Sequence, residues 1–265
     1  MITSLHNQRI KDVVKLTSAR ERRKQNLFLI EGVRELSLAI TSGYGVKNLF
    51  VCDELLSVSG KMLVNKLGIP TEKVSADVFC KMVYREGSDG IIAVLRPIYL
   101  SLDTVRLSAN PFVIVLEAVE KPGNLGAVLR TADAARVDAV IVCDPKTDIY
   151  NPNTIRSSIG CVFTQQIAVC TSEEALQWLK QAGIRIFAAE LTASEWYHET
   201  DFTKPTAIVM GTEADGLTDY WLRNADHRIK IPMRGYIDSL NVSVSTAILT
   251  FEAMRQRIKQ LTIDN

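Results

Sequence analysis

The chain has 265 residues, of which 47% are hydrophobic and 23% are charged, which is typical of a globular protein with one large or two modest domains. Its apolar runs stay well short of the roughly 18 residues of a membrane span, and the start, MITSLHNQRIKD, lacks the apolar core of a signal peptide. We therefore expect a cytoplasmic protein without a membrane partner. The five cysteines and three histidines are scattered, a pattern that predicts neither a disulfide framework nor a metal site.

Positive charge is concentrated near the N-terminus, although the net charge is only +1. Residues 1–40 contain eight basic and four acidic side chains, and the densest cluster is Arg20, Arg22, Arg23 and Lys24. Such a cluster on a nearly neutral protein indicates one region that contacts a polyanion, and we predict that these four residues bind RNA. A solvated helix face is the alternative explanation for the same pattern.

The N-terminal third alternates between helical and extended patterns. We predict a helix within the first ~20 residues, strands at 28–30, 49–52 and 91–95, and helices at 33–42 and near 61–67. A polar stretch bracketed by prolines, from Arg96-Pro97 to Asn110-Pro111, follows this compact α/β unit. We therefore predict a first domain over 1–97, a linker over 98–110 and a second domain over 111–265.

The second domain repeats the alternation more regularly. Apolar strands are predicted at 112–118, 139–143, 167–170, 185–191, 207–211 and 228–233, with helices at 125–136, 154–160, 173–182 and 218–224 and a final helix after the last strand. Nearly continuous apolar strands separated by helices predict an α/β fold whose parallel sheet is covered on both faces. Ligands of such sheets bind beyond the carboxyl ends of the strands.

Three loops at predicted strand ends have unusual compositions. The first, EAVEKPGNLGAVLR at 117–130, leads into a helix that carries Arg130. The second, GTEADG at 211–216, spaces its glycines like a phosphate-binding P-loop, but Leu217 follows where that motif needs lysine. The third, IPMRGYIDSLNVSVSTA at 231–247, runs from a strand into a helix that Ser239 or Asn241 is suited to cap. Each loop alone is compatible with an ordinary connection.

Together these loops resemble the three motifs of the SpoU family of RNA ribose 2′-O-methyltransferases, in the SPOUT superfamily. The matching segments are NLGAVLRTADA at 124–134, MGTEADGL at 210–217 and IPMRGYIDSLNVSV at 231–244. Residues 1–97, with FLIEGVREL at 28–36, resemble the ribosomal-protein-like substrate-binding domain that often precedes the catalytic domain. The resemblance implies a deep trefoil knot in the second domain, a homodimer, and S-adenosylmethionine as the cofactor.

The resemblance also implies a set of cofactor contacts, made largely through backbone groups of the second and third loops. Carried onto this chain, they are Leu191, Gly211, Ile231, Met233 and Leu240. The catalytic residues that it implies are Asn124, Arg130, Glu213, Ser239 and Asn241.

The reaction implied is attack of a ribose 2′-oxygen on the methyl carbon of the cofactor. An arginine activates the hydroxyl in the family, yet a guanidinium is effectively always charged in proteins. We therefore favour a role for Arg130 in holding a phosphate and stabilising the developing alkoxide, with Glu213 or Asn124 orienting it. Deprotonation by Arg130 is the alternative role.

The implied substrate is structured RNA, most simply ribosomal RNA because a separate binding domain precedes the catalytic one. A transfer RNA methyltransferase, a catalytically inactive RNA-binding relative and a nucleotide-binding regulator are the alternatives. The intact polar positions of the motifs argue against an inactive relative, and the missing lysine after Gly216 argues against the regulator.

Overall fold

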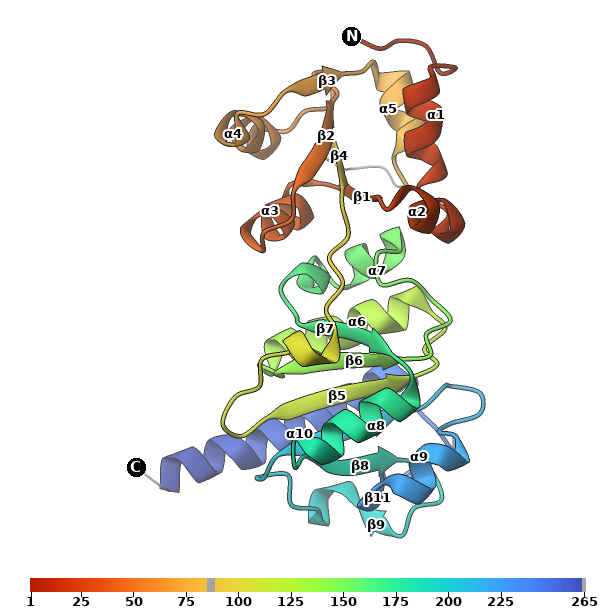
Figure 1. Cartoon of the computed structure of the whole chain (residues 1–265), viewed down its shortest axis with the longest axis vertical. Coiled ribbons are helices and arrows are strands. Elements are labelled where there is room, and N and C mark those ends of the chain that lie inside the picture. Colours follow the sequence, from red (N-terminus) through yellow and green to blue (C-terminus); the bar gives the residue numbers. More distant parts are fainter. Residues whose placement is uncertain (85–88, 264–265) are drawn as a thin grey trace. The chain divides into compact units, whose positions relative to one another are not determined.

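The computed structural model describes residues 1–84 and 89–263 (Figure 1). Their contacts form two compact units, the first comprising Met1–Ile98 and Asp148–Thr164 and the second Tyr99–Thr147 and Gln165–Asn265. The sequence placed residues 148–164 in the second domain because of their position in the chain. In the structure this segment packs with the first unit instead.

A four-stranded sheet is the centre of the described part of the first unit. Its order is β1-β4-β2-β3, and β4 runs antiparallel to both of its neighbours, whereas β3 is parallel to β2. The strands are β1 (Phe28–Glu31), β2 (Val46–Val51), β3 (Thr71–Lys73) and β4 (Ile91–Leu95). Every residue of β4 is buried, which explains why its apolar run is readable in the sequence.

The helices that precede β4 in the chain lie beside this sheet (Figure 1), and a later helix contacts β1. They are α1 (Gln8–Lys15), α2 (Ala19–Gln25), α3 (Val33–Thr41), α4 (Val58–Leu67), α5 (Ala76–Met82) and α7 (Pro152–Ser157). Helices α1 and α5 contact each other over a core that includes Ile10, Phe50 and Phe79. The sequence analysis had not identified β3 and α5, because three strand residues and two helical turns give little periodic signal.

Aromatic packing explains why residues 148–164 belong to the first unit. Tyr150 stacks on Phe28 with the ring centroids 4.4 Å apart, and Phe163 stacks on the same ring at 5.9 Å. The hydroxyl of Tyr44 lies 3.0 Å from that of Tyr150. These aromatic side chains form an apolar contact at the start of β1. The residues that make it are far apart in the sequence, so only the folded chain brings them together.

The described residues of the second unit form a seven-stranded sheet with the order β7-β6-β5-β10-β8-β11-β9. Every strand pair is parallel, as the sequence predicted. The strands are β5 (Phe112–Glu117), β6 (Ala139–Cys143), β7 (Ile167–Cys170), β8 (Arg185–Ala189), β9 (Glu195–Trp196), β10 (Thr206–Met210) and β11 (His227–Lys230). Because the strands are parallel, their carboxyl ends lie at one edge of the sheet.

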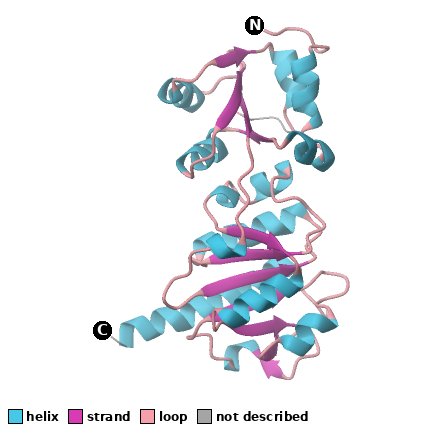
Figure 2. Ribbon diagram, viewed as in Figure 1, coloured by secondary structure: helices cyan, strands magenta, loops and turns pink. Residues whose placement is uncertain are grey.

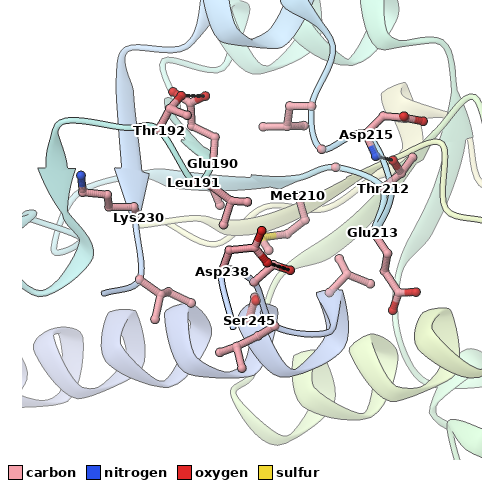
Figure 3. A pocket seen from close by; sticks show the side chains of 18 of the residues that line it. Glu190, Leu191, Thr192, Met210, Thr212, Glu213, Asp215, Lys230, Asp238 and Ser245 are labelled. Atoms are coloured by element: carbon pink, nitrogen blue, oxygen red, sulfur yellow. Dashed lines mark hydrogen bonds between the residues drawn. The ribbon is translucent and has the colours of Figure 1, made fainter. Parts of the chain in front are cut away.

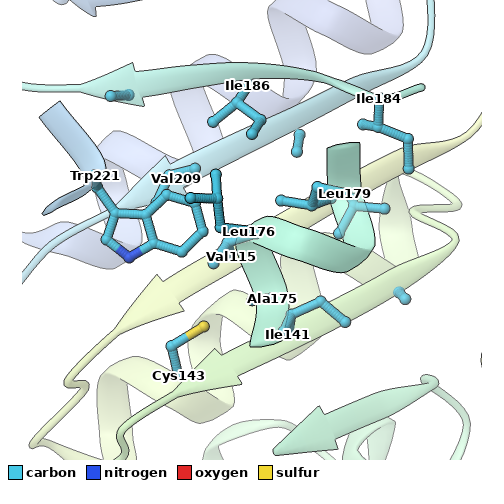
Figure 4. Close-up of a cluster of buried hydrophobic side chains, with 14 of the residues drawn as sticks. Val115, Ile141, Cys143, Ala175, Leu176, Leu179, Ile184, Ile186, Val209 and Trp221 are labelled. Atoms are coloured by element: carbon cyan, nitrogen blue, oxygen red, sulfur yellow. The ribbon is translucent and has the colours of Figure 1, made fainter. Parts of the chain in front are cut away.

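Helices cover both faces of this sheet (Figure 2). They are α6 (Pro122–Ala134), α8 (Ser172–Gln181), α9 (Asp219–Asn224) and α10 (Val242–Ile263). Helices α8 and α9 bury a cluster that includes Val115, Leu179 and Trp221 (Figure 4). Helices α6 and α10 pack against each other, and α10 also contacts β10. Within the described ranges, none of the helices has the length and apolarity that crossing a membrane requires.

Candidate functional site

A cavity of about 400 Å³ lies where the loops after β8, β10 and β11 converge at the carboxyl edge of the second sheet. All five residues that the sequence predicted as cofactor contacts line it: Leu191, Gly211, Ile231, Met233 and Leu240. Neighbouring carboxyl ends explain this grouping, because β8 lies between β10 and β11 in the sheet. Ser239 also lines the cavity.

The lining of this cavity combines apolar side chains with acidic groups. Figure 3 shows Leu191, Met210 and Asp238 directed toward its interior, whereas the Glu213 carboxylate points away from it. Four carboxylates and one lysine belong to the lining residues: Glu190, Glu213, Asp215, Asp238 and Lys230. Glu190 is held by Arg228 and by the Thr192 hydroxyl at 3.1 Å. Because Glu190 pairs with Arg228 and Glu213 with Lys121, the remaining excess is Asp215 and Asp238 against Lys230, and this small acidic excess favours a ligand with a positive charge.

Gly211 is required by the packing of its own loop. A Cβ at this position would lie 2.1 Å from the carbonyl carbon of Gly216 and 2.3 Å from the nitrogen of Leu217. The loop closes on itself through hydrogen bonds from the Thr212 nitrogen to the Gly216 oxygen (2.9 Å) and from the Gly216 nitrogen to the Thr212 oxygen (3.2 Å). A side chain at Gly211 would therefore displace this loop before it met any ligand.

Next to the cavity, polar side chains from all three sequence motifs form one hydrogen-bonded cluster. Asn124 donates from Nδ2 to Oε1 of Glu213 at 2.8 Å. Asn241 donates to the same carboxylate oxygen and, at 3.2 Å, to Oδ1 of Asn124. The ammonium of Lys121 binds the other oxygen of Glu213. We name Lys121, Asn124, Glu213 and Asn241 the Glu213 cluster; it ties the three loops together.

The charge state of Glu213 follows from these contacts. Hydrogen bonding to Lys121, assisted by the bond from Asn124, holds the pKa of the Glu213 carboxyl below its usual range. A group whose pKa lies far below the working pH is a weak general base. In these contacts Glu213 is an anionic acceptor that joins the three loops.

Asn241 is the N-cap of α10, which decides between the two capping residues that the sequence had left open. Its Oδ1 accepts hydrogen bonds from the Ser243 nitrogen at 3.0 Å and from the Ser243 hydroxyl at 2.6 Å. The Ser239 hydroxyl instead donates to the neighbouring Asp238 carboxylate at 3.1 Å. Asn241 thus caps the helix with its oxygen and holds the Glu213 cluster with its amide nitrogen.

Arg130 lies on the same helix as Asn124 but is exposed. Within residues 1–84 and 89–263, its guanidinium forms neither a hydrogen bond nor an ion pair. The expected contact from Glu213 or Asn124 to Arg130 is not among the hydrogen bonds of the described residues, where these two side chains bond to each other. Helical geometry gives the reason, since positions six residues apart are rotated by about 240° around the helix axis.

The sequence analysis missed Glu117, the last residue of β5. Its buried carboxylate accepts hydrogen bonds from the Thr218 nitrogen at 2.8 Å and from the Thr218 hydroxyl at 2.7 Å. These bonds fix the chain just after the second motif to the strand that precedes the first. The available signal was an acidic residue at the end of an otherwise apolar strand, which is costly to bury without partners.

In the first unit, the four predicted RNA contacts do not form one surface. Arg20, Arg23 and Lys24 are exposed, whereas Arg22 is only 4% exposed. The Arg22 guanidinium donates to the Asp148 carboxylate at 2.7 Å and to the carbonyl oxygens of Leu16 and Thr17, both at 2.8 Å. The prediction that Arg22 contacts RNA is therefore wrong, because its guanidinium is buried in an ion pair.

No group of three histidine, cysteine, aspartate or glutamate residues with ligand geometry occurs in the part of the chain that the structure describes.

Comparison with known proteins identifies the family. The model of the SpoU rRNA methylase family matches residues 111–251, and that of the MRM3-like substrate binding domain matches residues 7–93. This chain belongs to the SpoU rRNA methylase family. The cavity and the Glu213 cluster lie within the part of the chain that the SpoU model matches.

Several relatives match almost the whole chain. A Bacillus subtilis protein, the 23S rRNA (guanosine(2553)-2′-O)-methyltransferase RlmP, is 34% identical over 94% of this chain and 97% of its own. A crystal structure of an RNA 2′-O ribose methyltransferase superposes with a TM-score of 0.86 at 38% identity, covering 97% and 99% of the two chains. The AdoMet-bound rRNA methyltransferase from Sinorhizobium meliloti gives a TM-score of 0.87 at 30% identity, covering 96% and 97%. The SpoU assignment therefore extends over both units.

Proposed function

We propose that this protein transfers a methyl group from S-adenosylmethionine to a ribose 2′-hydroxyl of structured RNA, most simply ribosomal RNA. The observation that carries this proposal is the convergence of the three SpoU motifs on one site. The second and third motifs line the cavity, and polar residues of all three form the Glu213 cluster beside it. Its SpoU relatives include enzymes named as 23S rRNA 2′-O-methyltransferases.

The residues of the cavity fit S-adenosylmethionine. Leu191, Met233 and Leu240 offer apolar contact to an adenine ring, next to the backbone groups at the ends of β10 and β11. The cofactor carries a sulfonium and an ammonium against a single carboxylate, so its net charge suits the acidic lining of the cavity. When bound, the cofactor supplies an electrophilic methyl group.

Residues of this chain must position the ribose and manage the proton of its hydroxyl. The 2′-oxygen would develop alkoxide character as it gives up its proton to solvent water, so a nearby fixed cation would stabilise it. Arg130 is the exposed cation of the first motif, and we assign it to the adjacent phosphate and to this developing negative charge. The Glu213 cluster maintains the loop geometry around the cofactor. Ser239 and Asn241 hold the third loop, through the hydrogen bonds to Asp238 and from Ser243.

Ribosomal RNA is favoured as the substrate by the activities for which full-length relatives are named and by the match to a substrate-binding domain. A solved structure that concerns methylation of C/U34 on tRNA covers only 57% of this chain, at a TM-score of 0.53. We assign RNA binding in the first unit to Arg20, Arg23 and Lys24, which are exposed on α2. The proposed enzyme acts in the cytoplasm, where ribosomal RNA is its substrate.

A homodimer and the trefoil knot complete the proposal. Helix α10 exposes apolar side chains seven residues apart, namely Val244 (47% exposed), Phe251 (43%) and Ile258 (55%). Residues at this spacing lie on one side of a helix, and an exposed apolar stripe is suited to a second copy of the chain.

Two measurements test this proposal. Isothermal titration should show binding of S-adenosylmethionine, and mapping of 2′-O-methylation in the RNA of a deletion strain should reveal one lost ribosomal site that the wild-type gene restores. A purified protein that binds no S-adenosylmethionine would refute the enzymatic assignment. Loss of methylation in transfer RNA instead would keep the chemistry and change the substrate.

A further inference from the structure

The first unit contains a cavity of its own, of about 330 Å³, between α1, the end of α2 and strands β2 and β3. Its floor is apolar, since Leu16, Phe50 and Val94 line it and each is at most 2% exposed. Its rim is polar and includes the side chains of Arg9, Lys47 and Glu72. An apolar floor beneath a few fixed polar groups is typical of a ligand site.

Two polar residues stand on the inner face of the sheet beside this floor. Asn48 is aligned with Val94, and Glu72 is aligned with Phe50 on the neighbouring strand. Asn48 and Phe50 are two residues apart, so they face the same side of β2. The sheet therefore presents an amide and a carboxylate where apolar residues would extend the core.

The Glu72 carboxylate is held in place and remains accessible. Asn48 donates to Oε1 at 3.0 Å, and Arg9 donates to Oε2 at 3.0 Å. The Glu72 side chain keeps 23% of its surface exposed. A carboxylate offers about four lone-pair directions, and these two bonds leave acceptor capacity on both oxygens.

The charges around the cavity balance. Arg9 and Lys47 are basic, and Asp12 and Glu72 are acidic. Such a lining suits a neutral, planar molecule with a hydrogen-bonding edge better than it suits a free anion or cation. An RNA base has that chemistry, and single-stranded bases are recognised by apolar contact together with hydrogen bonds to their edges.

The cavity also adjoins the exposed basic surface. Gln25, which lines the cavity, directly follows Lys24 on α2, and Arg23 and Lys24 are exposed. An RNA strand whose phosphates contact these cations is therefore positioned to insert a base into the cavity beside Gln25.

We propose that this cavity receives one unpaired base of the substrate RNA, and that Glu72 selects guanine. Guanine presents two N–H donors, at N1 and N2, on a single edge, which matches the two oxygens of a carboxylate. Adenine, cytosine and uracil place an acceptor beside their donor on that edge, and this acceptor would oppose Glu72. The inference rests on the proposed RNA substrate but concerns a site in the other unit.

Fluorescence anisotropy with the full-length protein tests this inference without any methyl transfer. The probes are labelled octamers of uridine that carry one central guanosine, inosine or adenosine. Inosine lacks only the N2 amino group of guanosine. We expect the guanosine probe to bind about tenfold more tightly than the other two, which is the discrimination that a good bidentate contact provides.

The matched variants are Glu72→Gln and Asp53→Asn. Asp53 forms an exposed ion pair with Lys73 in the same unit, so its variant removes the same charge outside the cavity. Glu72→Gln should bind the three probes equally, whereas Asp53→Asn should keep the guanosine preference. Circular dichroism checks that both variants are folded. If Glu72→Gln does not fold, Asn48→Asp is the second variant; it removes the amide donor to Oε1 of Glu72 and should likewise lose the guanosine preference.

Any of three results would overturn the inference. The first is equal binding of the guanosine and inosine probes by the wild type, the second is binding of no probe, and the third is loss of the guanosine preference to the same extent in both variants. Titration of S-adenosylmethionine into the same preparations separates it from the proposed function. If the protein binds S-adenosylmethionine but shows no guanosine preference, only the base site is refuted. If it prefers guanosine but does not bind S-adenosylmethionine, only the proposed enzymatic function is refuted.

Discussion

Helices α2 and α6 each carry an arginine that the sequence predicted to be functional, and the structure treats the two side chains differently. Arg22 on α2 is buried against Asp148 and two carbonyl oxygens. Arg130 on α6 is exposed and, within the described residues, has no polar partner. A guanidinium that is buried in an ion pair is not accessible to a second anion, whereas an exposed and unpaired one is. The difference shows that partners and burial, more than residue type, separate a structural arginine from a catalytic candidate.

The largest expected effect is at Arg130. Arg130→Ala should reduce single-turnover methyl transfer by on the order of 100-fold or more, because a fixed donor to the developing alkoxide is lost. Affinity for S-adenosylmethionine should stay within a few-fold of the wild type, since Arg130 does not line the cavity. Arg130→Lys keeps the charge but loses the planar fork, and should retain little activity.

Arg223→Ala is the matched control for Arg130, because Arg223 is an exposed arginine of the same unit that pairs only with Asp219 on its own helix. It should retain wild-type activity. Full activity in Arg130→Ala would remove Arg130 from the site. A pH dependence of the single-turnover rate that the lysine variant alone abolishes would favour Arg130 as the base.

The second effect concerns Arg22. Asp148→Ala should lower the free energy of unfolding by about 3 kcal/mol, because breaking a buried ion pair leaves an uncompensated charge. Chemical denaturation followed by circular dichroism measures the change. Asp219→Ala breaks an exposed pair and should cost less than about 0.5 kcal/mol. Equal losses in the two variants would mean that the buried pair contributes no more than a surface one.

A smaller effect is expected on the exposed side of α2. Replacing Arg20, Arg23 and Lys24 by glutamine should lower the slope of log affinity for ribosomal RNA against log salt concentration by about 2, through reduced counterion release. The control is the double variant Lys61→Gln with Lys66→Gln, at exposed positions of α4. The change in slope is compared per positive charge removed. An unchanged slope in the triple variant would make the basic cluster a solvated helix face.

The smallest effect is a pH shift in the Glu213 cluster. Lys121 holds the pKa of Glu213 low, so the charged carboxylate supports the site at neutral pH and this support is lost as the pH falls through the lowered pKa. Lys121→Met should raise that pKa, and the loss of cofactor affinity on acidification should begin at a higher pH. Titration calorimetry over a pH series measures the shift.

Lys146→Met is the control for the pH shift, because Lys146 forms its ion pair with Glu120 and not with Glu213. In this variant, cofactor affinity should begin to fall on acidification at the same pH as in the wild type. Superimposable acid limbs for Lys121→Met and the wild type would show that Glu213 does not link cofactor binding to pH.

The sequence by itself determined much of the second unit. Strands β6 and β7 were predicted with their observed bounds. Strands of a parallel sheet covered by helices have uninterrupted apolar sequences, so their ends can be recognised. The three motifs likewise identified residues that line one cavity or join one cluster, because parallel strands carry their following loops to the same edge.

Only the tertiary structure decided which polar groups were already engaged. Glu213 bonds to Asn124 and Asn241, which lie 89 and 28 residues away, and Arg22 bonds to Asp148, 126 residues away. Residues 148–164 join the first unit for the same reason, because Tyr150 and Phe163 bury their rings against Phe28. Periodicity and motif spacing report local backbone preferences, whereas pairing at these separations depends on the packed fold.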